Sequence, residues 1–477
     1  MAPSAFGPDG LYGGGERYPM ELARALAADV DCELVTFGPR PGRWLEESGL
    51  RVRVLRPLAR LGGHPAQPVA PRLPAALAGA EIVHAHHFRS LPTRMAAVTA
   101  RLAGAGTAVT DHGLLGRTWG GLVHRLFDRY LTVSRFSAGL LGAPPERTEV
   151  IYGGADTRRF APVPGAARDG VLFVGRLTPH KGIDRLLQAL PAGAPLRVAG
   201  SAGHDPRLPE RDYPDLLRRL AQGRDVSFLG PVPDAALPGL YRGAVALALP
   251  SVDRTCYGRP VPVSELLGLV ALEAMASGTP VVASRLGGLA EVVVDGETGF
   301  LVPPGDTAAL GDRLARLLGD RRLAARLGAN ARDHVLARFT WRACAERCLA
   351  AYERLGIGRF FVRVDGLRVP GGGGKAEHLV EHLDAIGVEA PAALLVGDAL
   401  DDLAAARAVG AGCVLYDGGS HHRDALEATG VPVAGTLTEA VAVAAGSAPG
   451  RRRPAPATRP ARSAGRPPAR RTAARAG

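Results

Sequence analysis

Residues 264–288 read SELLGLVALEAMASGTPVVASRLGG, a helix-like run that passes into the short apolar stretch PVVAS. Glu265 and Glu273 lie eight positions apart with Gly268 between them. If the helix starts near Leu267, Glu273 sits about two turns inside it, roughly 12 Å along the axis from Glu265 at 1.5 Å per residue. That length resembles the distance from the sugar to the ribose of a nucleotide sugar, and the free N–H groups of the helix start would face the phosphates. Two acids eight positions apart on an amphipathic helix are also commonplace, so the pair alone is weak evidence.

The same alternation of apolar runs and helix-like segments extends from residue 30 to residue 350. It predicts an α/β fold with parallel, doubly wound sheets that are covered on both faces. An aperiodic stretch near 155–170 carries Pro, Gly and charge, and we interpret it as the linker between two Rossmann-like halves. The apolar runs are CELVTFG at 32–38, EIVHAHH at 81–87, TAVTDHG at 107–113, YLTVS at 130–134, VLFVGR at 171–176, LRVAG at 196–200, VSFLG at 226–230 and VALALPS at 245–251.

A glycine run, YGGGER at 12–17, precedes the first expected helix. Gly14 and Gly15 lack a Cβ, so their backbone can approach a ligand closely beside the free N–H groups of the helix start. A tight flexible turn explains the run equally well. The segment before this helix contains no strand of useful length, although a doubly wound domain needs a first strand there. Either the sequence starts one strand late or the domain has an unusual edge, and we favour the late start.

Only two of the 58 basic residues are lysines, Lys181 and Lys375. Arginine replaces lysine cheaply where a cation is merely solvated, but not where a compact ammonium must fit beside phosphate or carboxylate. Lys181 lies in VLFVGRLTPHKG at 171–182, where a loop that also holds Arg176 follows a strand. Two cations at the carboxyl end of a parallel strand, beside a helix start, indicate a diphosphate site. A solvated loop with two ordinary charges is the alternative, and the scarcity of lysine favours the site.

Together these segments make residues 1–352 resemble the family 4 retaining glycosyltransferases, which have the GT-B fold. The glutamate pair followed by the Ala-Met-Ala-Ser-Gly run is the most specific signal. The resemblance implies two Rossmann-like domains that face a cleft. The matching stretches follow the order of the family and include YGGGERYPMELARAL, IVHAHH, TDHG, LTVSRFS, FVGRLTPHKGIDRLLQAL and ELLGLVALEAMASGTPVVAS.

The resemblance also implies roles for the charged residues of the donor site. Arg176 and Lys181 would neutralise the donor diphosphate, and Lys181 would stabilise the charge that develops as the sugar leaves. Glu265 would bind hydroxyls of the transferred sugar. Glu273 would bind the ribose hydroxyls.

Further positions are implied around these four. Backbone amides near Leu267 and Gly268 would complete the phosphate cradle. His112 would face the reacting sugar from the first half, and Gly14 and Gly15 would approach the donor phosphate or the acceptor.

Three departures from the family pattern affect this site. Leu266 and Leu267 stand where the family usually has a small, glycine-containing pair, which suggests a narrower pocket or an altered sugar orientation. Gly153 replaces the usual asparagine and loses one polar contact. The stretch DRTCYGRPVPV at 253–263 lengthens the loop before Glu265, where it could shape sugar or acceptor choice or be neutral surface.

Three histidines, His84, His86 and His87, stand at the end of an expected strand. No carboxylate or cysteine completes a zinc-ligand set around them, so we interpret them as polar contacts on the acceptor side. We predict no metal site and no cofactor for the transfer.

Lys375 opens a second resemblance, to the back half of a haloacid-dehalogenase-like (HAD-like) phosphatase. There the lysine steadies the phosphate, and Asp398, Asp401 and Asp402 after a strand would hold magnesium. The only candidate for the nucleophile motif is RVDGL, where Arg363 occupies the position of the nucleophile, and arginine cannot form the phosphoryl intermediate. We therefore expect a segment without independent phosphatase activity, and a role for Mg²⁺ is considered only if this segment is functional.

The distribution of charge and the cysteine content limit the partners and the compartment that the sequence predicts. The net charge is +12, but residues 447–477 hold nine arginines and no acid, so the rest of the chain carries only +3. A nucleic-acid partner is therefore not expected. Five scattered cysteines without zinc-ligand spacing fit a reducing cytoplasm, and peripheral contact with an anionic membrane through the arginine-rich end is the one membrane role considered.

The predicted organisation has five parts. They are an N-terminal acceptor domain (1–155), a nucleotide-sugar donor domain (156–340), a helix crossing back to the N-terminal domain (341–355), a partial HAD-like domain (356–446) and a disordered basic tail (447–477).

The predicted function is retaining, metal-independent transfer of a sugar from a nucleotide diphosphate sugar to a sugar, lipid-linked or small-molecule acceptor. An epimerase or hydrolase on the same fold and a non-catalytic nucleotide-sugar-binding scaffold are the alternatives.

Overall fold

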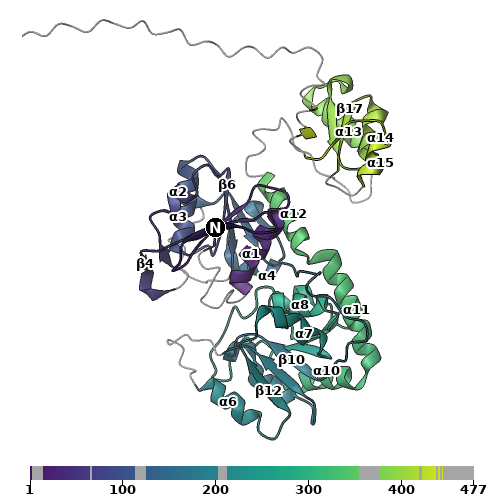
Figure 1. Cartoon of the computed structure of the whole chain (residues 1–477). Helices are drawn as coiled ribbons and strands as arrows, with labels where there is room; N and C mark the ends of the chain where they lie inside the picture. Colours follow the sequence, from purple (N-terminus) through teal and green to yellow (C-terminus); the bar gives the residue numbers. More distant parts are fainter. Residues whose placement is uncertain are drawn as a thin grey trace, which may run out of the picture. The chain divides into compact units, whose positions relative to one another are not determined.

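The computed structural model describes residues 1–2, 14–64, 67–112, 125–201, 212–353, 375–417, 422–436, 439–440 and 443. By its internal contacts the chain divides into two compact units, Met1–Phe360 and Phe361–Gly477. The first unit holds both expected Rossmann-like halves (Figure 1).

The second half of the first unit is built on a six-stranded sheet in the order β12-β11-β10-β13-β14-β15, with every neighbouring pair parallel. Counted along this half, that order is 3-2-1-4-5-6, the doubly wound arrangement that binds ligands where the strand order reverses. Here the reversal lies between β10 and β13. The strands are β10 (Val171–Val174), β11 (Leu196–Ala199), β12 (Val226–Gly230), β13 (Ala246–Leu249), β14 (Val281–Ser284) and β15 (Gly299–Val302).

Both faces of this sheet are covered, as the continuous apolar strands predict. On one face Val171 and Phe173 pack with buried residues of α5 and α10, and on the other Leu172 and Leu247 pack with residues of α7, α8 and α11. The helices are α5 (Ile183–Ala189), α6 (Tyr213–Leu220), α7 (Leu237–Arg242), α8 (Leu269–Ala276), α9 (Leu289–Val292), α10 (Thr307–Gly319) and α11 (Arg321–Arg338), with short 3-10 turns η4 (Pro179–Lys181) and η5 (Asp234–Ala236).

The first half contains a four-stranded parallel sheet, β6-β7-β8-β9, and a three-stranded sheet, β1-β3-β2. The strands are β1 (Glu33–Phe37), β2 (Gly42–Leu45), β3 (Arg51–Leu55), β6 (Ile82–His86), β7 (Gly106–Asp111), β8 (Arg129–Thr132) and β9 (Thr148–Val150), and a minor pair is β4 (Ala59–Arg60) and β5 (Pro68–Val69). The helices are α1 (Gly14–Leu26), α2 (Leu73–Ala76), α3 (Leu91–Leu102) and α4 (Arg135–Leu141), with 3-10 turns η1 (Leu61–Gly63) and η3 (Pro145–Arg147).

Met1 and Ala2 lie between the two sheets of this half. The Ala2 amide donates to the Val35 carbonyl at 3.0 Å, and the His86 amide donates to the Met1 carbonyl at 2.9 Å. These two residues thus occupy the position expected of a first strand.

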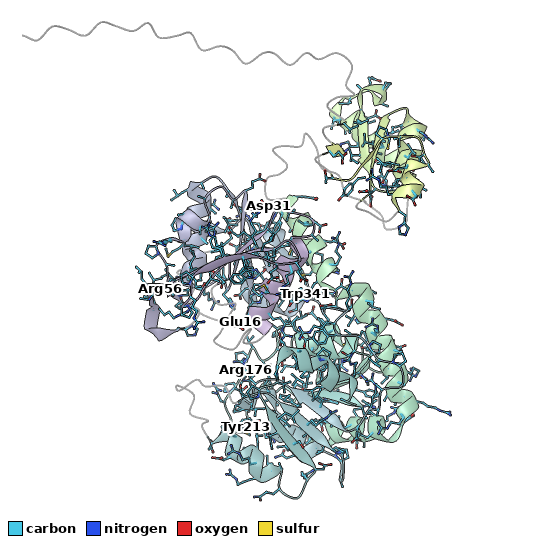
Figure 2. All side chains as sticks on the ribbon, in the orientation of Figure 1. Glu16, Asp31, Arg56, Arg176, Tyr213 and Trp341 are labelled. Atoms are coloured by element: carbon cyan, nitrogen blue, oxygen red, sulfur yellow. The ribbon has the colours of Figure 1, made fainter. Side chains whose placement is uncertain are left out.

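The chain crosses between the halves twice, and the two crossings are hydrogen-bonded to each other. The Ala155 amide donates to the Phe339 carbonyl at 2.9 Å, and Ala155 forms a parallel bridge with Thr340. Gly154 permits this approach, because a Cβ there would lie 2.2 Å from the Thr340 carbonyl carbon. After the second crossing α12 (Trp341–Glu353) packs on α1, and Figure 2 shows Trp341 at the junction of the halves.

The second unit contains a three-stranded parallel sheet, β16-β17-β18. Its strands are β16 (Leu394–Gly397), β17 (Gly412–Tyr416) and β18 (Val433–Ala434), and its helices are α13 (Lys375–Ile386), α14 (Leu400–Val409) and α15 (Arg423–Glu427), with the 3-10 turn η7 (Ala390–Ala392). The doubly wound α/β prediction is confirmed, and none of the described helices is long and apolar enough to cross a membrane.

Candidate functional site

Lys181 and Glu265 meet where the strand order of the six-stranded sheet reverses. Lys181 ends η4 after β10, and Glu265 follows β13 along the chain. The Lys181 ammonium donates to Glu265 Oε1 at 2.6 Å, and the Ser251 hydroxyl donates to the same oxygen at 2.7 Å. Burial opposes ionisation of Glu265, but the Lys181 charge and these two hydrogen bonds outweigh it and lower the pKa of the carboxyl.

The turn that carries Lys181 is fixed by the neighbouring loop. Gly182 has φ of +67°, and a Cβ there would lie 2.0 Å from the Pro250 carbonyl oxygen, so only glycine fits. The His180 carbonyl accepts hydrogen bonds from the Val252 amide at 2.9 Å and the Ser264 hydroxyl at 3.1 Å. Both ends of the inserted loop at 253–263 are therefore anchored to the Lys181 turn.

Two further residues with basic side chains, His180 and Arg176, lie around this turn. Burial lowers the pKa of His180 to about 4, and the charges of Lys181, Arg176 and Arg259 lower it further while Glu265 opposes them. Arg176 is exposed, and among the described residues its side chain forms no hydrogen bond or ion pair. Figure 2 labels it on the part of the second half that lies toward the first half. The site thus combines one paired cation with one cation available to an anionic ligand.

Glu273 lies on the fifth residue of α8, and α8 starts two residues later than the sequence suggested. Gly268 has φ of +100°, outside the helical region, so it caps the helix rather than entering it. Leu267 is buried and packs in the core shared with Tyr18. Gly153 lies against both of them: a Cβ there would be 2.7 Å from Tyr18 Cε2 and 3.1 Å from Leu267 Cδ2. The two departures from the family pattern are therefore neighbours, and the Tyr18 ring, with Leu267 beside it, leaves little room for a side chain at Gly153.

The Glu273 carboxylate already has two protein partners. Arg17 donates from Nη1 to Oε1 at 2.6 Å, and the Tyr241 hydroxyl donates to Oε2 at 2.8 Å. Arg17 also pairs with Asp234, at the start of η5. Burial raises the pKa of Glu273, although Arg17 and Tyr241 stabilise the charged form.

Sequence reasoning missed Arg17, although a signal was present. A cation in the first turn of a helix opposes the helix dipole and implies a specific partner.

The glycine run places α1 between the two halves. A Cβ at Gly14 would lie 3.6 Å from Leu269 Cδ1 on α8, and one at Gly15 would lie 3.4 Å from His87 Cε1. His87 has φ of +63°, a strained conformation for a residue with a side chain.

The histidines gather at the carboxyl ends of β6 and β7, which pair in parallel. His86 Nδ1 lies 3.0 Å from His112 Nε2. His84 lies between the Tyr352 hydroxyl, 2.5 Å from its Nδ1, and the Thr110 hydroxyl, 2.7 Å from its Nε2. His84 thus ties α12 to the first sheet.

Burial lowers the pKa of every histidine in this group. The pKa of His84 falls to about 3 and that of His87 to about 4, and those of His86 and His112 fall well below the ordinary range. The four rings are therefore neutral at pH 7. Across the described part of the chain, no three His, Cys, Asp or Glu side chains are placed to hold a metal ion.

In the second unit the partly exposed Lys375 pairs with two carboxylates. Its ammonium lies 2.7 Å from Asp402 Oδ1 and 3.1 Å from Asp401 Oδ2. The other oxygen of Asp402 accepts from the Asp398 and Ala399 amides at 3.1 and 3.0 Å, so it caps α14. Arg363 lies outside the described residues.

Comparison with known proteins agrees with this architecture. Residues 12–159 match Glycosyltransferase Family 4, residues 157–334 match Glycosyl transferases group 1, and residues 373–440 match a HAD-hydrolase-like family. The relatives include D-inositol 3-phosphate glycosyltransferases from Nocardia farcinica (38% identical over 233 residues, 45% of this chain and 49% of the relative) and Corynebacterium glutamicum (35% over 231 residues, 44% and 52%). The chain spans about half the length of these curated relatives.

Solved structures share the fold. A sucrose-phosphate synthase from Thermosynechococcus elongatus aligns with a TM-score of 0.56 and 26% identity over 72% of this chain and 94% of that one. Anabaena HepE in complex with UDP-glucose aligns with a TM-score of 0.57 and 22% identity over 72% and 96%. Residues 12–334 therefore belong to the group 1 and family 4 glycosyltransferases of the GT-B fold, and residues 373–440 match a HAD-like family model.

Proposed function

We propose that the chain transfers a sugar from a nucleotide diphosphate sugar to an acceptor with retention of configuration and without a metal ion. The observation that carries the proposal is the Lys181–Glu265–Ser251 group at the reversal point of the six-stranded sheet, with Arg176 exposed beside it. Open α/β sheets bind ligands at that point. The solved HepE complex with UDP-glucose supports a nucleotide-sugar donor.

The charges suggest how the residues would act. Arg176 and Lys181 would neutralise the diphosphate as the bond to the sugar breaks, which is the task that a metal ion performs in other transferases. Glu265 would accept hydrogen bonds from sugar hydroxyls, because its carboxylate stays ionised and Lys181 and Ser251 use only one of its oxygens. The leaving phosphate would take the proton of the acceptor on the same face of the sugar. His112, neutral at pH 7, would contribute hydrogen bonds and no charge.

The test is an assay of the full chain against a panel of nucleotide sugars that begins with UDP-glucose, with and without acceptors. D-inositol 3-phosphate belongs in the acceptor panel, because curated relatives carry its name. We expect release of the nucleoside diphosphate only when an acceptor is present, an unchanged anomeric configuration by NMR, and full rate in EDTA. Free or epimerised sugar at full rate without acceptor would favour the hydrolase or epimerase alternative. Unchanged cellular function of a Lys181→Ala variant would favour the scaffold.

A further inference from the structure

Arg17 reaches from the first half of the chain into the expected nucleotide site of the second half. It lies in the first turn of α1, and its side chain is only 14% exposed. Its guanidinium spans two carboxylates of the other half, Glu273 on α8 and Asp234 on η5. A planar guanidinium donates in a fixed fork, so it fixes the orientation of a carboxylate better than a flexible ammonium does.

The contacts of Glu273 leave acceptor positions unused on a carboxylate whose side chain is 6% exposed. An ionised carboxylate offers about four lone-pair positions. Arg17 takes one on Oε1 and Tyr241 takes one on Oε2, so each oxygen retains one acceptor position. Two neighbouring acceptor positions match the two adjacent hydroxyls of a ribose.

We propose that Arg17 is a positioning residue of the donor site, which orients the Glu273 carboxylate as an acceptor for the ribose hydroxyls. This inference rests on the proposed function. It goes further in making the nucleotide site a product of both halves, because its ribose contact depends on a side chain that the other half supplies.

The charge around Glu273 supports this role. Arg17 on α1 and Arg159 stabilise the carboxylate, Tyr241 on α7 donates to it, and burial acts against its charge. Asp234 shares the guanidinium of Arg17. Without Arg17 the buried carboxylate would lose its nearest cation, and a carboxyl that takes up a proton loses an acceptor position.

The experiment is calorimetric titration of the full-length wild type, Arg17→Ala and Arg17→Lys with UDP, ADP and GDP, and with the 2′-deoxy form of whichever binds. Removal of the 2′-hydroxyl should weaken binding to the wild type about tenfold, because one hydrogen bond to a charged group is lost. Arg17→Ala should bind the ribonucleotide about tenfold more weakly, and its ratio of ribo to deoxy affinity should fall toward one, because the two changes remove the same interaction. Arg17→Lys should recover part of that ratio.

The matched control is Arg24→Ala, which removes an arginine on the same helix that also pairs with two carboxylates, Glu21 at 2.9 Å and Glu46 at 2.7 Å. It should leave the ratio unchanged. A ratio in Arg17→Ala equal to that of the wild type, or tighter ribonucleotide binding in that variant, would overturn the inference and show that Arg17 competes with the ribose. Absence of nucleotide binding by the wild type would instead refute the proposed function on which it rests.

Discussion

The substitution Gly153→Ala tests the packing that holds the glutamate loop in place. Its added methyl group would lie 2.7 and 3.0 Å from two ring carbons of Tyr18 and 3.1 Å from Leu267 Cδ2. Carbon atoms pack best at about 3.5–4.0 Å, so the ring would have to move by roughly 0.8 Å or more. Tyr18 is held on other sides, because its hydroxyl donates to the Ile151 carbonyl at 3.0 Å and its ring meets that of Trp341 at 5.2 Å.

The expected cost follows from this lack of free space. Overpacking a fitted core costs about 1–3 kcal/mol, and we expect the upper half of that range because Tyr18 is fully buried. For a domain of this size each kcal/mol lowers the melting temperature by roughly 2–4 °C. An asparagine at Gly153, the residue usual in the family, should cost more, since its amide would also need hydrogen-bond partners.

Thermal unfolding followed by fluorescence measures the effect, with Gly139→Ala as the control. Gly139 lies inside α4, and a Cβ there would have no heavy atom within 4 Å, so alanine should stabilise this helix by about 0.5–1 kcal/mol. A melting temperature of Gly153→Ala at or above that of the wild type would refute the argument, because Tyr18 and Leu267 would then have room to yield.

Four more substitutions or conditions give distinct outcomes. Lys181→Ala should lower the transfer rate, measured as initial rates, by at least a hundredfold, since oxyanion-type stabilisation is worth about 2.7–4 kcal/mol. Lys181→Arg should recover little of that rate, because a guanidinium is bulkier than the ammonium that lies beside Glu265. Tyr352→Phe should destabilise the first unit by about 1–3 kcal/mol in urea unfolding, since His84 loses a buried partner, and a cost below 0.5 kcal/mol would contradict the pairing. Acid should destabilise the fold from about pH 6.5 downward, because His84 and His87 bind protons near that pH in the unfolded chain but stay neutral in the folded chain until about pH 3–4. Each histidine should lower the free energy of unfolding by about 1 kcal/mol by pH 5.5, measured as urea midpoints in a pH series. A flat profile from pH 7 to 5.5 would contradict their burial. Lys375→Ala should leave both transfer and hydrolysis of p-nitrophenyl phosphate with Mg²⁺ unchanged, the latter at background, and measurable phosphatase activity lost in the variant would show that the HAD-like segment is active.

Much of the fold could be predicted from the sequence because parallel strands buried on both faces are continuous apolar runs. VLFV, LRVA and ALAL each form a strand of one sheet. The loops after the first two strands contain Gly182 and Gly200, where a Cβ would collide with a neighbouring carbonyl oxygen. The start of α8 was placed two residues early, because the sequence does not reveal that Gly268 adopts a left-handed conformation. The run Leu266-Leu267-Gly268-Leu269 has apolar spacing that fits a helix whether the helix starts at Leu267 or at Leu269.

The candidate site was predictable where a residue stands in a recognisable local motif and hidden where only a long-range contact marks it. Lys181 and Glu265 stood out through rarity and spacing, and the structure places them in contact. Arg17 and Tyr241 pair with Glu273 across 256 and 32 positions, and such pairs leave no local pattern in one sequence. The roles of the individual site residues in binding and transfer stay predictions.

The double crossing at Ala155 and Thr340 has a mechanical consequence. A single crossing would let the two halves bend and twist relative to each other about several axes. Two crossings that are hydrogen-bonded side by side resist twisting of one half against the other and leave rotation about a single axis. Opening of the donor site would then be a rotation about that axis. A bulky residue at Gly154 would disrupt the contact between the two crossings before it affected the fold of either half.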